Sequence, residues 1–594
     1  MKPILTYIQK EVAQAFQAEH IDAEFAMVSH SNRPDLCQYQ SNGALAAAKK
    51  YKKAPIMIAE AVAEQLSKNP MFSMVEAVKP GFINLTLSSS YLAEFLNTMA
   101  REDNFGFEKT KEPKKVIIDY GGPNVAKPLH VGHLRPAIIG ESIKRISRFV
   151  GDEVIGDVHL GDWGLPMGLI ITELKKRKPE LPYFQKDYKG EYPEKALFTI
   201  VELEEIYPYA SAYAKEHKEY MEEAHRATYL LQQGDRGYLA LWQHTLDVSI
   251  ADLKRNYESL DVSFELWKKE SDAQKYIPAM VEEMKEKGYA YLSEGALVVD
   301  VKEETDTKEI PPCMILKSDG ATLYNTTDLA TIVERMKLFS PDAIVYVVDK
   351  RQELYFEQIF RCAKKTRLVN KDTKLTFLGF GTMNGKDGKP FKTRSGGVMR
   401  LEHLIHEINE AVYKKIMENR SMSEDEARNV AKLVGLAALK YGDLSNQASK
   451  DYVFDIDRFT SFEGETGPYL LYTIVRIKSI LAKYKEIEKE SKEQKILSAY
   501  SQSETDLSLV LVRFHEMILA AYKENAPHKV CQYLYDLSNA FNKFYHENKI
   551  IGEAEKEKQS SWIALITLTL QILNCCISSV SYHSKYCLPS ILIL

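Results

Sequence analysis

The sequence is poor in the residues that build disulfide or zinc frameworks. Only 7 of its 594 residues are cysteines, and no pair of Cys-x-x-Cys elements occurs at metal-ligand spacing. We therefore expect neither a structural metal site nor a disulfide-rich secreted fold.

The sequence also lacks a long uninterrupted apolar run. Its start, MKPILTYIQKEVAQAF, has no apolar core followed by a small-residue cleavage site, so it predicts an amphipathic helix rather than a signal peptide. The apolar C-terminal stretch is broken by His583, Lys585 and Pro589, short of the roughly 20 residues that a membrane span needs. We expect a cytoplasmic protein without membrane contact.

Neither sign of charge dominates. The formal net charge of -5 argues against a protein that coats nucleic acid nonspecifically, but it leaves room for a local basic face. The hydrophobic fraction of 45% and the charged fraction of 27% are ordinary for a globular protein. The length exceeds the roughly 100 to 200 residues of one domain, so several domains are expected.

Hydrophobic patterning divides the chain into three predicted domains. Residues 1–110 combine a helical pattern with an alternating run at 82–87, which predicts a small α+β domain. Residues 111–421 predict an α/β domain with a Rossmann-like, doubly wound parallel sheet and a helical insertion at about 170–290. Its expected strands are 116–119, 153–158, 295–299, 344–348 and 376–380. Residues 422–594 carry apolar residues at intervals of three or four, which predicts an all-α bundle.

Two histidines and a glycine lie where the first of these strands gives way to a helix. Backbone N–H groups and the dipole at a helix start favour a bound anion, and Gly132 lets a ligand approach the backbone closely. His130 and His133 can both donate toward one phosphate group. For so short a string, simple capping of the helix is an equally good explanation. No Gly-x4-Gly-Lys-Ser/Thr element occurs, which argues against a P-loop enzyme.

A longer comparison of motifs favours the phosphate site. HVGH resembles the HIGH element of class I aminoacyl-tRNA synthetases, and PNVAKPLHVGHLRPAIIGESIKRI and HLGDWGLPMG closely resemble arginyl-tRNA synthetases. The resemblance extends over nearly the whole chain. It implies an arginine–tRNA ligase that forms arginyl-adenylate from L-arginine and ATP with Mg²⁺, and then transfers arginine to the 3′ end of tRNA(Arg). It also implies that tRNA is needed for the first step, and that His130, Gly132 and His133 bind ATP and stabilise charge electrostatically.

A second candidate phosphate loop, PFKTRSGG at 390–397, mixes cations, hydroxyls and glycines. By composition alone a basic surface turn is the better explanation, but HVGH upstream reverses that preference. The loop resembles the KMSKS loop of the family imperfectly, because Arg394 and Ser395 depart from it. The resemblance implies that the lysine before HIGH substitutes for a missing cation. We therefore predict Lys127 and Lys392 as catalytic cations, with Arg394 assisting at ATP.

Recognition of arginine requires carboxylates, because guanidinium presents a planar fork of donors. Tyr324 and Asp328 are four residues apart and would face one cavity on a helix, although for such a pair alone a helix cap or surface position is the better explanation. The family resemblance favours the pocket. The predicted arginine site is Asp119, Asn124, Tyr324, Asp328 and Gln352. Gly121 and Gly122 stand where many family members have serines, so a hydroxyl contact is absent there.

Two further regions resemble the tRNA-binding parts of the family. The polar and aromatic segment 31–43 is similar to its additional N-terminal domain, and residues 454–478 are similar to its anticodon-binding bundle. We predict that Tyr469, Tyr472 and Arg476 contact anticodon bases by stacking, with core packing as the alternative for the tyrosines. The C-terminal SYHSKYCLPSILIL departs from the family.

Two other functions remain open at this point. One is a class I synthetase for another amino acid, and the other is a catalytically idle paralogue that binds RNA. The oligomeric state expected is a monomer.

Overall fold

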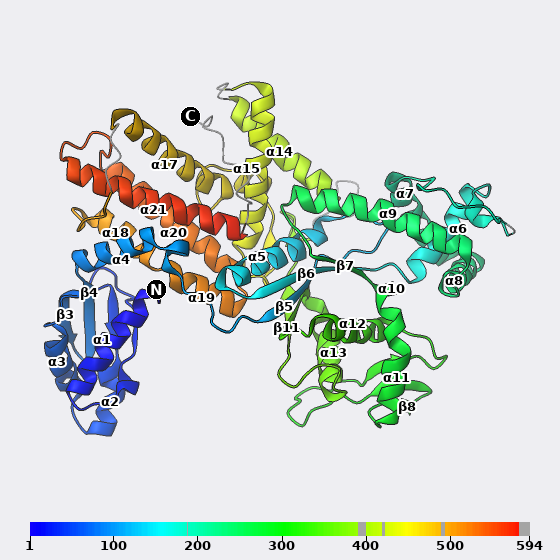
Figure 1. The fold of residues 1–594 in the computed structure, drawn as a ribbon, viewed down its shortest axis with the longest axis horizontal. Coiled ribbons are helices and arrows are strands. Elements are labelled where there is room, and N and C mark those ends of the chain that lie inside the picture. The colour runs from blue at the N-terminus through cyan, green and yellow to red at the C-terminus, as the bar shows by residue number, and fades with distance from the viewer. Residues whose placement is uncertain (187, 390–398, 419–421, 489–493, 581–594) are drawn as a thin grey trace. The chain divides into compact units, whose positions relative to one another are not determined.

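The computed structural model describes residues 1–594 except 187, 390–398, 419–421, 489–493 and 581–594. The chain divides into two compact units (Figure 1). Unit 1 joins residues 1–110 to residues 461–594, and unit 2 comprises residues 111–460.

The N-terminal part of unit 1 is the small α+β domain that the sequence predicts. Its antiparallel sheet has the order β1-β2-β4-β3. The strands are β1 (Val28–His30), β2 (Tyr39–Ser41), β3 (Phe72–Val78) and β4 (Phe82–Leu87). The helices are α1 (Ile4–Ala18), α2 (Gly43–Tyr51), α3 (Pro55–Leu66) and α4 (Ser89–Arg101). In α1, apolar residues at four-residue intervals are buried, which is why this segment is an amphipathic helix.

The C-terminal part of unit 1 is helical, as predicted. It contains α17 (Gly467–Ile487), α18 (Gln502–Val512), α19 (Phe514–Glu524), α20 (Pro527–Glu547) and α21 (Lys556–Val580). Within this unit the N-terminal domain and the helices are joined by hydrogen bonds. The Asn97 side chain bonds both backbone groups of Ile496, at 2.7 and 2.9 Å, and the His515 imidazole lies 2.7 Å from the Phe105 carbonyl oxygen.

Helix α21 is the one described helix long and apolar enough to cross a membrane, over Lys556–Ser578. In this structure 56% of its most apolar window is buried inside the protein. Trp562, Leu565, Ile566 and Leu573 are each at most 2% exposed. The apolar residues of α21 therefore contribute to the core of unit 1.

Unit 2 is built on a five-stranded parallel sheet, which confirms the predicted doubly wound fold. The order is β12-β11-β5-β6-β7, so the chain runs outward from β5 to β7 and then continues on the other side of β5. The strands are β5 (Lys115–Tyr120), β6 (Glu153–Leu160), β7 (Leu266–Lys269), β11 (Ala343–Asp349) and β12 (Lys374–Phe380). The order reverses between β5 and β11, and at such a point a crevice opens beyond the carboxyl ends of the strands.

One predicted strand is wrongly placed. Strand β9 (Ala296–Val299) does not join the parallel sheet, because it pairs antiparallel with β8 (Tyr291–Ser293) and β10 (Cys313–Leu316). The fifth parallel strand is instead β7, which is only four residues long, includes two lysines and is half-buried throughout. It lacks the apolar run that marks the other parallel strands, so the sequence pattern missed it.

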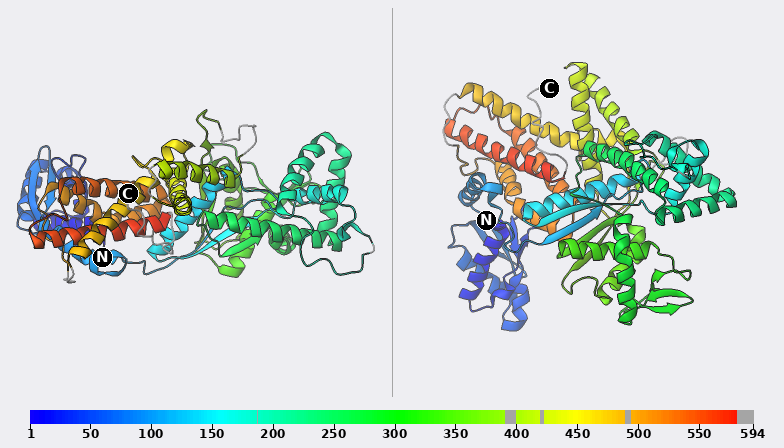
Figure 2. Two further views of the ribbon diagram at one scale, coloured as in Figure 1. Left: turned by 90° about the horizontal axis from the view of Figure 1, so that it is seen from above. Right: turned by 45° about the vertical axis from the view of Figure 1, so that its right-hand side comes forward.

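Helices cover the sheet on both faces, and a helical insertion interrupts the chain between β6 and β7. The insertion comprises α6 (Leu165–Arg177), α7 (Ile200–Glu216), α8 (Lys218–Gln232) and α9 (Arg236–Ser259). The other helices near the sheet are α5 (Leu134–Val150), α10 (Glu270–Ala273), α11 (Ile277–Glu286), α12 (Tyr324–Phe339) and α13 (Glu353–Lys365). Figures 1 and 2 show the insertion as a cluster separate from α11–α13.

Unit 2 continues beyond residue 421, where the patterning suggested that the bundle begins. It also contains α14 (Leu401–Glu418), α15 (Glu424–Leu444), α16 (Ile456–Phe459) and the paired strands β13 (Met383–Asn384) and β14 (Tyr452–Val453). Arg135 of α5 explains why α15 lies in this unit. The residue is 1% exposed, and its guanidinium pairs with Asp443 at 3.1 Å.

Candidate functional site

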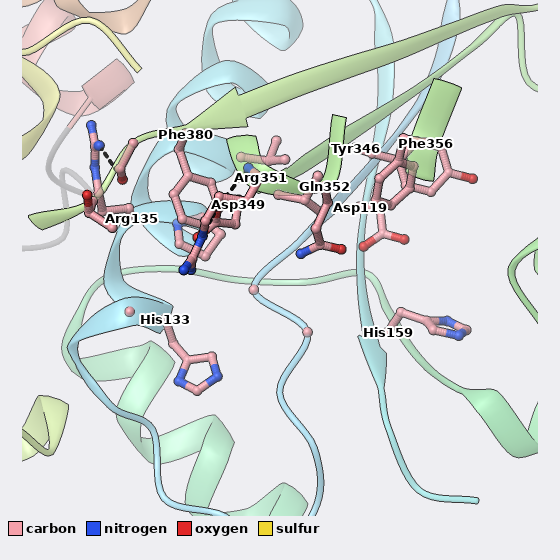
Figure 3. A pocket seen from close by; sticks show the side chains of 18 of the residues that line it. Asp119, His133, Arg135, His159, Tyr346, Asp349, Arg351, Gln352, Phe356 and Phe380 are labelled. Carbon is pink, nitrogen blue, oxygen red and sulfur yellow. Dashed lines mark hydrogen bonds and ion pairs between the residues drawn. The ribbon is translucent and has the colours of Figure 1, made fainter. Parts of the chain in front are cut away.

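A cavity of about 560 Å³ opens at the carboxyl ends of the parallel strands in unit 2 (Figure 3). Asp119, His159, Asp349 and Phe380 line it, and each lies at or next to the end of a different strand. The predicted site residues His130, Gly132, His133, Asp328 and Gln352 line it too. The cavity therefore occupies the position where doubly wound sheets bind ligands.

The two histidines of HVGH hold each other in place at the start of a short 3-10 helix, Val131–His133. The Gly132 N–H donates to Nδ1 of His130, and the His130 N–H donates to Nδ1 of His133, both at 3.1 Å. The ring centroids are 3.9 Å apart. Because each Nδ1 accepts a hydrogen bond, the neutral tautomer carries its proton on Nε2. Both rings thus retain one N–H donor for a ligand.

The electrostatic surroundings keep both histidines neutral. Burial lowers the pKa of His133 to about 3, and the charges of His130 and Lys127 act in the same direction. Burial and the charge of Lys127 also lower the pKa of His130. Because the pKa of both rings is lowered, the histidines are better suited to donate hydrogen bonds to phosphate oxygens than to transfer protons.

The backbone around HVGH pairs with the segment that follows the predicted second phosphate loop. The Val131 N–H donates to the Met399 carbonyl at 3.0 Å, and the Leu401 N–H donates to the Leu129 carbonyl at 2.9 Å. Residues 399–401 therefore lie beside HVGH. Lys392 and Arg394 themselves lie outside the described residues.

Lys127 is placed near HVGH but is not among the residues that line the cavity. Its Nζ lies 4.2 Å from the ring centroid of Tyr207, which belongs to α7 of the insertion. The side chain is half-buried.

The structure brings together some of the predicted arginine-binding residues and separates others from the cavity wall. Asp119, Asp328 and Gln352 line the cavity. Asn124 is exposed, and its backbone forms a bridge to Gly161. Tyr324 is 70% exposed at the first position of α12, although it lies close enough to Asp328 for their charges to interact.

Asp119 already has a cationic partner that the sequence did not suggest. Arg335 of α12 is 2% exposed and donates to Asp119 at 2.6 Å and to Asp157 at 2.7 Å. Its guanidinium carbon lies 5.4 Å from the ring centroid of Tyr346. The acidic end of β5 is thus partly neutralised from within the protein.

Asp328, by contrast, has no comparably close cation among the described ion pairs. The Tyr355 hydroxyl donates to its Oδ2. Burial raises the pKa of Asp328, although the hydrogen bond from Tyr355 and the nearby His159 oppose this shift. A bound guanidinium would supply the missing positive charge and favour the ionised carboxylate.

Two further residues interact electrostatically with Asp328, and neither was predicted from the sequence. His159 lines the cavity, and neither of its ring nitrogens has a hydrogen-bond partner among the described residues. Glu270, the first residue of α10, interacts electrostatically with His159, Asp162 and Asp328, and burial raises its pKa. The motif HLGDWG contains His159, so a signal existed for it. Glu270 directly follows β7, and because that strand was not predicted, Glu270 could not be placed near the site from the sequence.

The predicted anticodon-reading residues form one cluster on α17 in unit 1. The Tyr469 hydroxyl donates to Asn539 at 2.7 Å, and Arg476 donates to the Tyr472 hydroxyl at 3.0 Å. All three are half-buried, so each keeps part of its surface exposed. Asn542 bridges the two residues, because its amide oxygen accepts from Arg476 and its amide nitrogen donates to the Tyr469 hydroxyl.

In the part of the chain that the structure describes, no group of three or more His, Cys, Asp or Glu side chains is arranged to hold a metal ion.

A doubly wound sheet with an HVGH helix start at its ligand crevice defines the chain as a class I aminoacyl-tRNA synthetase. Comparison with known families agrees with this class. Residues 95–456 match the catalytic domain of class I (R) tRNA synthetases, residues 2–87 the arginyl-tRNA synthetase N-terminal domain, and residues 470–580 the DALR anticodon-binding domain.

Individual relatives are similar over almost their whole length. The chain is 58% identical to an arginine–tRNA ligase of Agathobacter rectalis, over 98% of this chain and 99% of that protein. It is 57% identical to one of Alkaliphilus oremlandii, over 97% and 98%. The crystal structure of arginyl-tRNA synthetase from Plasmodium falciparum has a TM-score of 0.79 at 25% identity, covering 98% of both chains. The chain belongs to the arginyl-tRNA synthetase family.

Proposed function

We propose that this chain attaches arginine to tRNA in two steps, with the first step in the cavity of unit 2. One observation carries the assignment of the site: a single cavity is lined by the neutral HVGH histidines and by the carboxylates Asp119 and Asp328. A nucleotide phosphate and a cationic amino acid would therefore meet there. High identity to arginine–tRNA ligases disfavours both an idle paralogue and a synthetase for another amino acid.

In the first step an oxygen of the arginine carboxylate attacks the α-phosphorus of ATP, and pyrophosphate leaves. The Nε2–H groups of His130 and His133 donate to the α-phosphate oxygens as negative charge builds there. The backbone at Gly132 allows close approach of the nucleotide. Mg²⁺ enters as part of the MgATP substrate, because it is usually held through phosphate oxygens. Lys127 and Lys392, assisted by Arg394, neutralise the leaving pyrophosphate.

Selection of arginine relies on the acidic side of the cavity. Asp328 pairs with the guanidinium, with Glu270 and the ring of Tyr324 beside it, and Asp119 adds a second acid at the end of β5. Asn124 and Gln352 bind the α-amino group. A lysine ammonium would leave part of this acceptor array unpaired, and buried unpaired acceptors give strong discrimination.

In the second step a ribose hydroxyl of the terminal adenosine of tRNA attacks the arginyl carbonyl carbon, and AMP leaves. Unit 1 binds the tRNA, with Tyr469, Tyr472 and Arg476 of α17 contacting anticodon bases and the domain of residues 1–110 contacting another part of the molecule. We propose that the enzyme works as a monomer in the cytoplasm.

The test is aminoacylation of total tRNA with labelled amino acids by the wild type, Asp328→Asn and Asp328→Ala. We expect charging with arginine alone. Asp328→Asn keeps the shape but removes the charge, and the loss of a charged hydrogen bond of ~3 kcal/mol corresponds to about a 100-fold rise in the KM for arginine. The KM for ATP should change little. Charging with another amino acid, or an unchanged KM for arginine in a folded Asp328→Asn, contradicts the proposal.

The dependence of the first step on tRNA is tested by exchange of pyrophosphate into ATP. With arginine alone we expect weak exchange, and addition of tRNA should raise it. Strong exchange without tRNA would remove this part of the proposal and leave the arginine assignment intact.

A further inference from the structure

Helix α7 of the insertion contacts two cations near HVGH, Lys127 and Arg400. Tyr207 and Glu204 are three residues apart and therefore share one face of the helix. The Tyr207 ring lies under the Lys127 ammonium at 4.2 Å, and Glu204 pairs with Arg400 at 2.8 Å. Lys127 precedes HVGH by three residues, and Arg400 forms a backbone bridge with His130. One helical turn thus contacts both Lys127, just before HVGH, and Arg400, whose backbone pairs with His130.

The insertion supplies the fixed partner in each contact. Tyr207 packs against a small buried cluster made by α6, α7 and α8, which includes Leu169, Ala210 and Ala224. The Glu204 side chain is 8% exposed, whereas Arg400 is 53% exposed. Burial raises the pKa of Glu204, while Arg400 acts to lower it. Tyr207 is therefore held by packing within the insertion, and Glu204 is the more buried partner of its ion pair.

The backbone on both sides of these contacts is unusual. Pro208 lies inside α7 and has no N–H to donate to the carbonyl of Glu204, so the turn that carries the two contacts lacks one helical hydrogen bond. Ala126, the residue before Lys127, has a φ of 57°, and its N–H donates to Ser249 Oγ of α9 at 2.9 Å. A left-handed conformation at a buried alanine is costly and persists only where its surroundings impose it.

The two anchors differ in what they do to the charge. An aromatic ring attracts an ammonium without cancelling its positive charge, so Lys127 on Tyr207 keeps its full charge for an incoming polyphosphate. A carboxylate neutralises its partner, so the Glu204 pair fixes Arg400 beside His130 rather than offering a free cation. The two contacts have complementary roles at one site.

We propose that Tyr207 and Glu204 are positioning residues for arginine activation: Tyr207 places Lys127 toward the triphosphate of ATP, and Glu204 holds Arg400, whose backbone pairs with His130 of HVGH. Both residues act through their partners Lys127 and Arg400, and neither touches the substrate. The inference rests on the proposed role of Lys127 in neutralising the leaving pyrophosphate.

The experiment is ATP–pyrophosphate exchange at saturating arginine and tRNA with ATP varied. Tyr207→Leu removes the ring, Tyr207→Phe keeps it, and Lys127→Met removes the cation. Tyr213→Leu is the matched control, because Tyr213 lies on the same helix and stacks on His217. We expect Tyr207→Leu to lower kcat/KM for ATP about five- to thirty-fold, the size of a cation–π contact of ~1–2 kcal/mol. Tyr207→Phe and Tyr213→Leu should stay within about twofold, and the KM for arginine should not change.

A double-mutant cycle separates a positioning role from a merely structural one. In the Lys127→Met background, Tyr207→Leu should have no further effect on kcat/KM for ATP. An equal loss in both backgrounds, or an equal loss for Tyr207→Phe and Tyr207→Leu, overturns the inference for Tyr207. If Lys127→Met itself exchanges as the wild type does, it is the proposed role of Lys127 that fails.

Variants of Glu204 provide a second test that does not depend on Tyr207. We expect Glu204→Gln to raise the KM for ATP several-fold without changing the KM for arginine, and Glu204→Asp to retain at least part of the wild-type value. If Tyr207→Leu lowers the midpoint of thermal unfolding, the comparison of Glu204→Gln with Glu204→Asp tests the positioning role instead. Equal KM values for ATP in Glu204→Gln and the wild type overturn the role of Glu204.

Discussion

The buried guanidinium of Arg335 offers the most direct test of how this site is held together. It compensates Asp119 and Asp157, which face each other on the adjacent strands β5 and β6, and it is 2% exposed. Replacing it by methionine leaves a side chain of similar length but two buried carboxylates without a cation. Removal of one partner of a buried ion pair costs about 3–5 kcal/mol, so we expect Arg335→Met to lower the free energy of unfolding of unit 2 by that amount.

The loss should depend on pH in a defined direction. Burial already raises the pKa of Asp157 above its ordinary value of 3.8 in spite of Arg335, and removing Arg335 raises it further. A carboxyl group whose folded pKa exceeds its unfolded pKa contributes stability at low pH that is lost as the pH rises through the folded pKa. The deficit of Arg335→Met relative to wild type should therefore be smaller at pH 5 than at pH 8.

The assay is urea unfolding followed by tryptophan fluorescence, since Trp163, Trp242 and Trp267 lie in unit 2 and only Trp562 lies in unit 1. Arg428→Met is the matched control. Arg428 is 47% exposed and pairs with Glu410 and Glu424, so its loss should cost no more than about 1 kcal/mol. Adding Asp157→Asn to Arg335→Met should restore part of the stability. A loss below about 1 kcal/mol for Arg335→Met, or a deficit that grows toward low pH, would refute the reasoning.

Three further outcomes follow from the structure. Because burial lowers the pKa of His133 to about 3, pyrophosphate exchange should show no ionisation of His133 between pH 6 and 9. The ratio of wild-type to His133→Asn rates should then be constant over that range, and a wild-type transition near pH 6.5 that the variant lacks would contradict it. Gly140→Ala should destabilise unit 2 by about 1–3 kcal/mol in thermal unfolding, because its Cβ would lie 2.2 Å from the Tyr120 ring, and this overpacking outweighs the helix propensity gained. Arg476→Met should raise the KM for tRNA in aminoacylation roughly tenfold, the effect of losing ~1–3 kcal/mol of base contacts, and leave the KM for arginine unchanged; a shift in the arginine value instead would argue against a tRNA-binding role.

The parts of the fold that the sequence predicted are those with a local signal. Strands β5, β6, β11 and β12 have apolar runs long enough to be recognised, and the two histidines of HVGH are close in the chain. Strand β7 is short and carries lysines, so only its pairing with β6 reveals it. Strand β9 is apolar like the parallel strands, and no local pattern shows which sheet it joins.

The same distinction holds for the site. Asp328 and Gln352 lie near the cavity as their motifs suggested, but the pairing of Arg335 with Asp119 spans 216 positions in the chain. A buried arginine on a helix has no periodic signature that separates it from an exposed one. The contacts of α7 with Lys127 and Arg400 likewise depend on how the insertion folds back toward HVGH, which is a tertiary property.

The assembly of unit 1 from both ends of the chain has a consequence for biosynthesis. The 350 residues from 111 to 460 must be translated before the partner helices of the first 110 residues are made. At ~5–20 residues per second this is a wait of roughly 20–70 s, followed by the time for the last helices. During that interval the side chains of Asn97 and the backbone of Phe105 have yet to meet Ile496 and His515. A nascent chain stalled within unit 2 would therefore expose an N-terminal domain with an unfinished docking face, the kind of surface that chaperones bind.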